Sequence, residues 1–135
     1  DDVHFIHGHQ PKPLPVGQEW DAYYLGALTN GPFQAVDGGL VRIERGWYAT
    51  HAVAYSRSIF DEIIGWRKDH PRAIDGFLAE SVQKRGKCFA TFPLCAIQRN
   101  SLTSIDHPHI HKNVMGALCL HLAADFRSEF LKSNP

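Results

Sequence analysis

Two adjacent carboxylates, Asp1 and Asp2, begin the sequence and are the first side chains that could do chemistry. Carboxylate oxygens are the ligands that Mg²⁺ and Mn²⁺ prefer, and a metal ion held in this way can neutralise a diphosphate. Acidic pairs are also common on solvated surfaces. Taken alone, the pair leaves both interpretations open.

Closely spaced histidines offer a second kind of metal ligand. The chain has nine histidines, and six of them fall into two groups, His4, His7 and His9, and His107, His109 and His111. Alternate spacing on an extended segment places the three side chains of the second group on one side, where imidazoles could bind a transition metal. Polar loop histidines are the alternative interpretation for both groups.

Asp75 and His51 are candidates for acid–base chemistry. Asp75 lies near the start of an expected helix, where a carboxylate can cap the backbone or serve as a general base aimed into a cleft. His51 begins an apolar strand and could be a hydrogen-bonded core residue or a catalytic one. The chain contains no nucleophile-elbow, P-loop or dinucleotide-binding glycine motif.

Composition limits the class of protein. The 135 residues are 44% hydrophobic with zero formal net charge, which predicts one domain over residues 1–135 and argues against disorder and nucleic-acid binding. No apolar run approaches the length of a membrane-spanning helix. Three cysteines exclude an even disulfide framework, so we expect three buried thiols, a reducing compartment and a cytoplasmic location.

The elements that would position these residues alternate between strands and helices, which predicts an α/β or α+β class. Residues 6–19, with three alternating prolines, predict a loop. Ser58 is the expected N-cap of a helix that stops at Pro71, and a second helix ends at Gly86. The remaining expected elements are strands at 21–26, 33–36, 40–43, 51–55 and 88–92, a loop at 99–113 and a helix at 114–131.

Six short segments share an order and spacing with a known family. They are residues 1–3 (Asp-Asp-Val), 20–26 (Trp-Asp-Ala-Tyr-Tyr-Leu-Gly), 50–56, 74–78 (Ile-Asp-Gly-Phe-Leu), 92–98 and 103–105. Together they resemble glycosyltransferase family 25, which includes bacterial lipooligosaccharide galactosyltransferases and collagen galactosyltransferases. The resemblance covers about residues 1–106. Ser104 stands where the family pattern has Asp.

The resemblance implies an α/β, partial GT-A-like fold, a mixed sheet with flanking helices, whose N-terminal nucleotide-binding half is missing from this chain. It implies transfer of a hexose, galactose, from a UDP-sugar to a glycan hydroxyl in cell-surface polysaccharide synthesis. Asp1 and Asp2 would hold Mn²⁺ or Mg²⁺, and Asp75 would be the catalytic base. We add His109 as a third metal ligand from its spacing. The expected substrate-binding residues are Trp20, Asp21, His51 and Gln98.

Other functions compete with the transferase. A metal-dependent hydrolase would use His107, His109 and His111 without a nucleotide, and a non-catalytic glycan-binding or interaction module would use neither. The expected partners of the transferase are the UDP-sugar and the glycan acceptor, with peripheral membrane association. An exposed sheet edge and apolar surface would favour a homo-oligomer.

Overall fold

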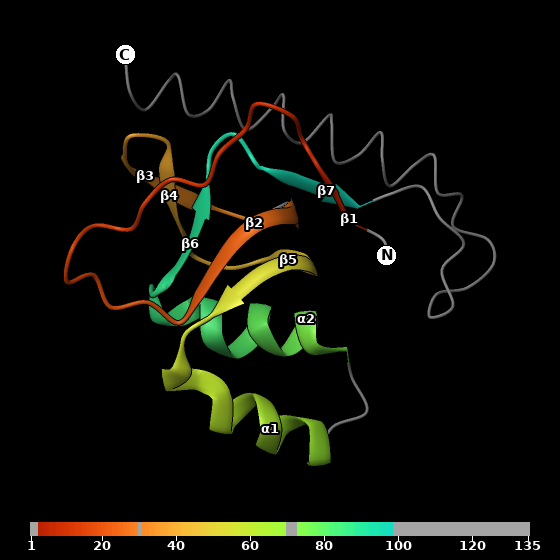
Figure 1. The fold of residues 1–135 in the computed structure, drawn as a ribbon. Coiled ribbons are helices and arrows are strands. Elements are labelled where there is room, and N and C mark those ends of the chain that lie inside the picture. The colour runs from red at the N-terminus through yellow and green to blue at the C-terminus, as the bar shows by residue number, and fades with distance from the viewer. Residues whose placement is uncertain (1–2, 30, 70–72, 99–135) are drawn as a thin grey trace.

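A mixed sheet of five strands organises the chain in a computed structural model (Figure 1). The structure describes residues 3–29, 31–69 and 73–98. The strands of the two sheets are β1 (Val3–Phe5), β2 (Ala22–Thr29), β3 (Phe33–Asp37), β4 (Leu40–Ile43), β5 (Trp47–Tyr55), β6 (Cys88–Thr91) and β7 (Ala96–Gln98). The order in the larger sheet is β3-β4-β6-β2-β5, and β1 pairs with β7 in a separate ribbon.

Strand β2 makes the one parallel pairing among the described strands, with β6 at the middle of the sheet. It runs parallel to β6 and antiparallel to β5, and the other neighbouring pairs are antiparallel. The β3–β4 hairpin turns at Gly38 and Gly39, whose φ values of 56° and 86° lie in the left-handed region that a two-residue type I′ turn requires. The hairpin predicted from Asp37-Gly38-Gly39 is thus confirmed.

Helices cover one face of the sheet, as Figure 1 shows. They are η1 (Arg57–Ile59), α1 (Phe60–Asp69), α2 (Ile74–Phe77), the π-helical turn η2 (Leu78–Val82) and η3 (Gln83–Arg85). The last segment ends at Gly86, with φ of 71°, as expected from the sequence. The predicted N-cap Ser58 is wrong. Ser56 caps the helical segment instead, because its hydroxyl accepts the Ser58 N–H at 3.4 Å.

Two hydrophobic clusters hold these layers together. Between sheet and helices lie fully buried side chains that include Tyr24, Trp47 and Leu78. Full burial of a side chain such as Leu78 stabilises the fold by about 1.5–3 kcal/mol. The opposite face carries a smaller cluster of Tyr23, Leu40 and Phe89, against which the N-terminal loop packs.

The loop predicted at residues 6–19 is confirmed, and its role is to cover the second face of the sheet. Leu14 and Trp20 pack against the smaller cluster, and the Tyr23 hydroxyl donates a hydrogen bond to the Lys12 carbonyl at 2.6 Å. Tyr23 therefore connects strand β2 to a segment that lacks regular structure of its own.

Comparison with the expected elements confirms the α/β class, a mixed sheet with helices against it. The strand expected at 51–55 begins earlier, at Trp47, and the strand expected at 21–26 extends to Thr29. The β1–β7 ribbon was not expected. Pro71, the loop at 99–113 and the helix at 114–131 lie outside the described residues.

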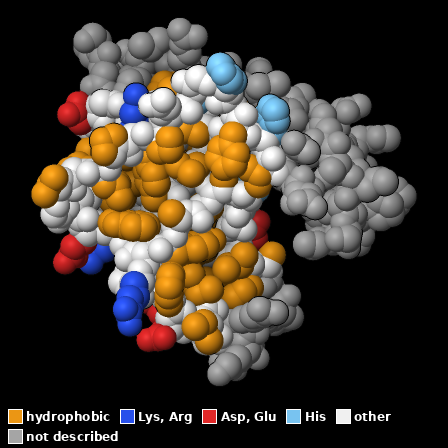
Figure 2. All heavy atoms as spheres, in the orientation of Figure 1, with side chains coloured by type: hydrophobic (Ala, Val, Ile, Leu, Met, Phe, Trp, Pro, Cys, Tyr) orange, Lys and Arg blue, Asp and Glu red, His pale blue; other side chains and the backbone are white. Residues whose placement is uncertain are grey.

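Hydrophobic side chains gather on the face of the molecule seen in Figure 2, and charged side chains lie toward its edges. On α1, Phe60 and Ile64 are 48% and 57% exposed and lie four residues apart. Spacing of four places both on one side of the helix. Among the described helices, none is long and apolar enough to cross a membrane.

Candidate functional site

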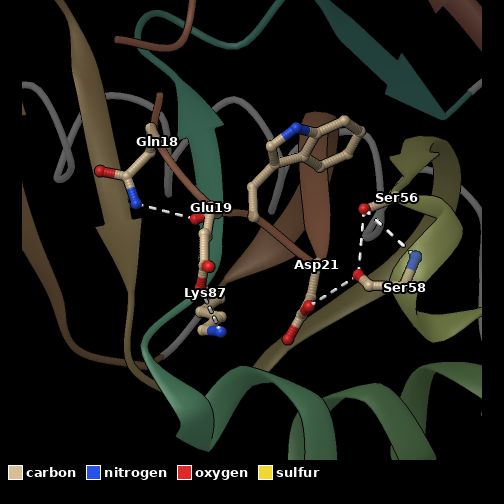
Figure 3. A pocket seen from close by; sticks show the side chains of 7 residues that line it. Gln18, Glu19, Asp21, Ser56, Ser58 and Lys87 are labelled. Carbon is tan, nitrogen blue, oxygen red and sulfur yellow. Dashed lines mark hydrogen bonds and ion pairs between the residues drawn. The ribbon is translucent and has the colours of Figure 1, made fainter. Parts of the chain in front are cut away.

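A shallow, open pocket of about 360 Å³ lies where strand β2 begins (Figure 3). Its lining is polar apart from one indole ring. The residues that line it are Gln18, Glu19, Trp20, Asp21, Ser56, Ser58 and Lys87. They come from the end of the N-terminal loop, from the turn after β5 and from the residue that precedes β6.

Backbone pairing brings these three segments together. The register aligns Ala22 with Tyr55 of β5 and with Cys88 of β6, so the preceding and following residues meet at one edge of the sheet. Asp21 N–H donates to the Lys87 carbonyl at 2.8 Å, and Ser56 N–H donates to the Asp21 carbonyl at 2.8 Å. The main chain of Asp21 is therefore fixed on both sides.

The Asp21 side chain is the most enclosed charged group in the pocket, with 6% of the residue exposed. Its Oδ1 lies 3.2 Å from Ser58 Oγ, which in turn lies 3.0 Å from Ser56 Oγ. A hydroxyl has one proton and a carboxylate is the stronger acceptor, so we assign the Ser58 proton to Asp21. Ser56 then supplies the proton for its own contact with Ser58.

Two ion pairs lie near this carboxylate, and the cation of each interacts with its charge. Lys87 Nζ lies 2.7 Å from Glu19 Oε2, and Figure 3 shows this pair on one side of Asp21 with Ser56 and Ser58 on the other. The hydrogen bond and charge of Lys87 hold the pKa of Glu19 below its ordinary value. Arg85 donates two hydrogen bonds to Glu62, at 2.6 and 2.8 Å.

The thiol of Cys88 shows how burial and charge combine beside the pocket. Desolvation raises its pKa to about 12, and the negative charge of Asp21 adds to the increase. A thiol with such a pKa is protonated at neutral pH and therefore a poor nucleophile. Cys88 is a buried packing residue, as expected from the sequence.

His51, expected to bind substrate, lies elsewhere on β5 and does not line this pocket. Both ring nitrogens are buried, and no described residue forms a hydrogen bond with either of them. Burial lowers the pKa of His51, and the nearby carbonyl of Ala96 opposes that shift in part. The ring lies against Gly26, where an added Cβ would approach His51 Nε2 and the Ala96 oxygen to 2.5 Å each.

Asp75, the expected base, also lies outside the lining of this pocket. It is the second residue of α2, and its Oδ1 accepts the Gly76 N–H at 2.8 Å. Burial raises the pKa of Tyr55, and the charge of Asp75 adds to that effect. Asp75 therefore lies in the helical layer, close enough to Tyr55 for its charge to act on the phenol.

The remaining candidates are scattered or undescribed. Gln98, the last residue of β7, pairs with Val3 of β1. His9 Nδ1 lies 2.7 Å from the Leu94 carbonyl, which fits a loop histidine. Asp1, Asp2 and the histidines at 107, 109 and 111 lie outside the described residues. Within residues 3–29, 31–69 and 73–98, no group of three or more His, Cys, Asp and Glu side chains could hold a metal ion.

Of the residues singled out from the sequence, Trp20 and Asp21 share a pocket, and His51 and Asp75 do not line it. Sequence reasoning missed the hydroxyls of Ser56 and Ser58 and the Glu19–Lys87 pair. Ser58 was recognisable in the sequence as a polar residue before a helix, but it was interpreted as the N-cap of that helix and not as part of a site. Lys87 carried no such signal, because its position follows from the parallel pairing of β2 with β6.

Comparison of the chain with models of protein families, with curated proteins and with solved structures found no match.

Proposed function

We propose that the chain is the acceptor-side part of a hexosyltransferase and that the Trp20–Asp21 pocket binds the acceptor saccharide. One observation carries the proposal. Trp20 and Asp21, adjacent in the segment that resembles family 25, line one pocket together with the hydroxyls of Ser56 and Ser58.

The chemistry of this lining suits a saccharide. Sugar rings present hydroxyl donors at their edges and apolar C–H groups on their faces. The Asp21 carboxylate has acceptor capacity beyond its bond to Ser58, and the serine hydroxyls both donate and accept. Trp20 is half-buried, so part of its indole remains available for an apolar contact.

The donor side of the proposal rests on the resemblance alone. The donor would be UDP-galactose, and Asp1, Asp2 and His109 would hold Mn²⁺ or Mg²⁺, which stabilises charge on a leaving diphosphate. The acceptor oxygen would bond to the anomeric carbon while the bond to the diphosphate breaks. The resemblance gives Asp75 the role of taking the proton of that hydroxyl, and because Asp75 does not line the Trp20–Asp21 pocket, the acceptor would have to extend beyond the pocket toward α2. We also propose that the protein is located in the cytoplasm, as the odd number of cysteines predicts.

A transfer assay tests the function. The 135-residue chain is incubated with UDP-galactose, Mn²⁺ and a panel of neutral glycan acceptors, and the galactosylated product and released UDP are quantified. We expect product to require acceptor, to be lost in Asp75→Asn, and to fall at least tenfold in Asp21→Asn. Asp61→Asn removes an exposed carboxylate on α1 and should change nothing.

Other results would favour the competing functions. Pocket-dependent glycan binding without transfer would indicate a glycan-binding module. Tight Zn²⁺ binding that is lost in His109→Ala, without any response to UDP-galactose, would favour the metal-dependent hydrolase. Transfer that is equal in the native chain, Asp21→Asn and Asp75→Asn would contradict the assigned roles.

A further inference from the structure

We propose that the pocket selects against acidic sugars and holds a free amino sugar most tightly, with its ammonium group at Asp21. This inference deepens the proposed function and rests on it. It concerns the chemical class of the saccharide, which the resemblance to family 25 does not define.

The side chains that line the pocket carry more negative than positive charge. Two acidic side chains, Glu19 and Asp21, and one basic side chain, Lys87, line the pocket. The charge of Lys87 is matched by Glu19 at 2.7 Å. In the described part of the chain, Asp21 forms no ion pair within 4 Å. The neighbouring Arg85 is paired with Glu62, so Arg85 and Lys87 act on Asp21 only through their charge, without direct contact. Three carboxylates, Glu19, Asp21 and Glu62, face two cations, which leaves one net negative charge here.

Burial strengthens the electrostatic effect of the Asp21 carboxylate, because little solvent screens it. Asp21 is 6% exposed, and its only side-chain hydrogen bond within the described residues comes from Ser58. A carboxylate accepts about four hydrogen bonds, and a buried one is costly unless donors satisfy it. A ligand that completes this site must therefore bring O–H or N–H donors. An ammonium group brings three donors and a positive charge.

An acidic sugar meets the opposite situation. Its carboxylate would approach Asp21 without a free cation to balance it, because Lys87 and Arg85 are each held by an acidic partner. Like charges brought together at a partly desolvated site repel each other. The exposed position of the Glu19–Lys87 pair leaves this pair largely screened by solvent.

Isothermal titration calorimetry of the 135-residue chain with three related probes tests the inference. The probes are galactosamine, methyl β-galactoside and galacturonic acid, at neutral pH and low ionic strength. We expect galactosamine to bind about fivefold more tightly than the methyl galactoside, which is the usual gain of a charge-assisted over a neutral hydrogen bond. Galacturonic acid should bind most weakly, and added salt should compress the order.

Two variants locate the cause. Asp21→Asn removes the charge and keeps the shape, so the advantage of galactosamine should disappear. Lys87→Gln frees Glu19 at an exposed position without disturbing the core, so that advantage should grow. Asp61→Asn should retain the native order. Circular dichroism of each variant establishes that it is folded, and the Lys87→Gln result stands if Asp21→Asn does not fold.

Equal affinities for the three probes in the native chain would overturn the charge selectivity and leave saccharide binding intact. An order that persists in folded Asp21→Asn, or that Lys87→Gln does not strengthen, would also overturn it. If none of the three sugars binds, the proposed saccharide pocket itself fails, and this inference fails with it.

Discussion

The side-chain amide of Gln83 holds both main-chain polar groups of Trp47. Trp47 N–H donates to Gln83 Oε1 at 3.1 Å, and Gln83 Nε2 donates to the Trp47 carbonyl at 2.7 Å. The same Nε2 donates to the Tyr24 hydroxyl at 2.9 Å. Both Gln83 and Trp47 are fully buried. The side-chain amide thus forms the same pair of hydrogen bonds that a neighbouring strand would form, and it joins the helical layer to β5.

Replacing Gln83 with Leu should destabilise the fold by about 2–4 kcal/mol. The change leaves the Trp47 amide and carbonyl without these partners in the core, and unsatisfied buried groups of this kind cost about 1–3 kcal/mol each. Urea denaturation followed by tryptophan fluorescence measures the loss. Lys84→Gln, one residue along and exposed, should stay within about 0.5 kcal/mol of the native chain. Equal stability of Gln83→Leu and the native chain would contradict the role of the amide.

Gly26→Ala should destabilise the chain because the position is closed to a side chain. An added Cβ would approach the Ala96 oxygen and His51 Nε2 to 2.5 Å, so β7 or the histidine must move. We expect a cost of about 1–3 kcal/mol, typical of overpacking. Gly65→Ala is the matched control, since an added Cβ meets no atom of the described residues within 4 Å, and the helix should gain up to about 1 kcal/mol. Thermal denaturation of both variants would show whether they shift in opposite directions.

Stability should fall as the pH falls below about 6.5, in part because of His51. Burial lowers the pKa of His51 in the folded chain, whereas in the unfolded chain this pKa lies near its ordinary value of 6.5. At a pH between the lowered pKa of the folded chain and 6.5, the unfolded chain binds a proton at His51 that the folded chain does not. Acid therefore favours unfolding. The free energy of unfolding at pH 7.5 and pH 5.5 measures the slope. His51→Gln should flatten it, and a replacement of the exposed His7 should not. A slope unchanged in His51→Gln would contradict this assignment.

Ala49→Gly should be tolerated far better than glycine substitutions usually are in strands. Ala49 has a φ of 62°, and no other non-glycine residue in the described ranges has a positive φ. The left-handed conformation costs alanine about 1–2 kcal/mol, and glycine adopts it freely. Release of this backbone strain stabilises the folded chain, which should offset the destabilising effect of the greater entropy of glycine in the unfolded chain. Ala54→Gly, also on β5 but exposed, should cost about 0.5–1 kcal/mol. Urea midpoints in the reverse order would exclude strain at Ala49.

The sequence predicted the elements that local chemistry determines. The glycine pair at 38–39 defined the β3–β4 hairpin, and Gly86 defined the end of the second helical segment. The β1–β7 ribbon could not be predicted, because strands of three residues become stable only through partners distant in the sequence. The N-cap was assigned to Ser58 instead of Ser56 because two serines two residues apart compete for one cap.

The candidate site divides in the same way. Trp20 and Asp21 were singled out because they are adjacent in a segment that resembles family 25, and in the structure both line one pocket. Lys87 enters the pocket only through the pairing of β2 with β6, which has no local signature. The structure also gives a physical reason for the glycine of that segment, since Gly26 lies under the Ala96 carbonyl and the His51 ring.

Binding of a saccharide at the Trp20–Asp21 pocket is the central claim, and amide-resolved NMR tests it most directly. The ¹⁵N-labelled 135-residue chain is titrated with methyl β-galactoside while its ¹H–¹⁵N correlation spectrum is recorded. We predict saturable shifts at the Trp20 indole and at the amides of Asp21, Ser58 and Lys87. The indole of Trp66, which lies on α1 and does not line the pocket, should be unchanged. Shifts confined to other regions, or a spectrum that stays unchanged up to the solubility limit of the sugar, would contradict the claim.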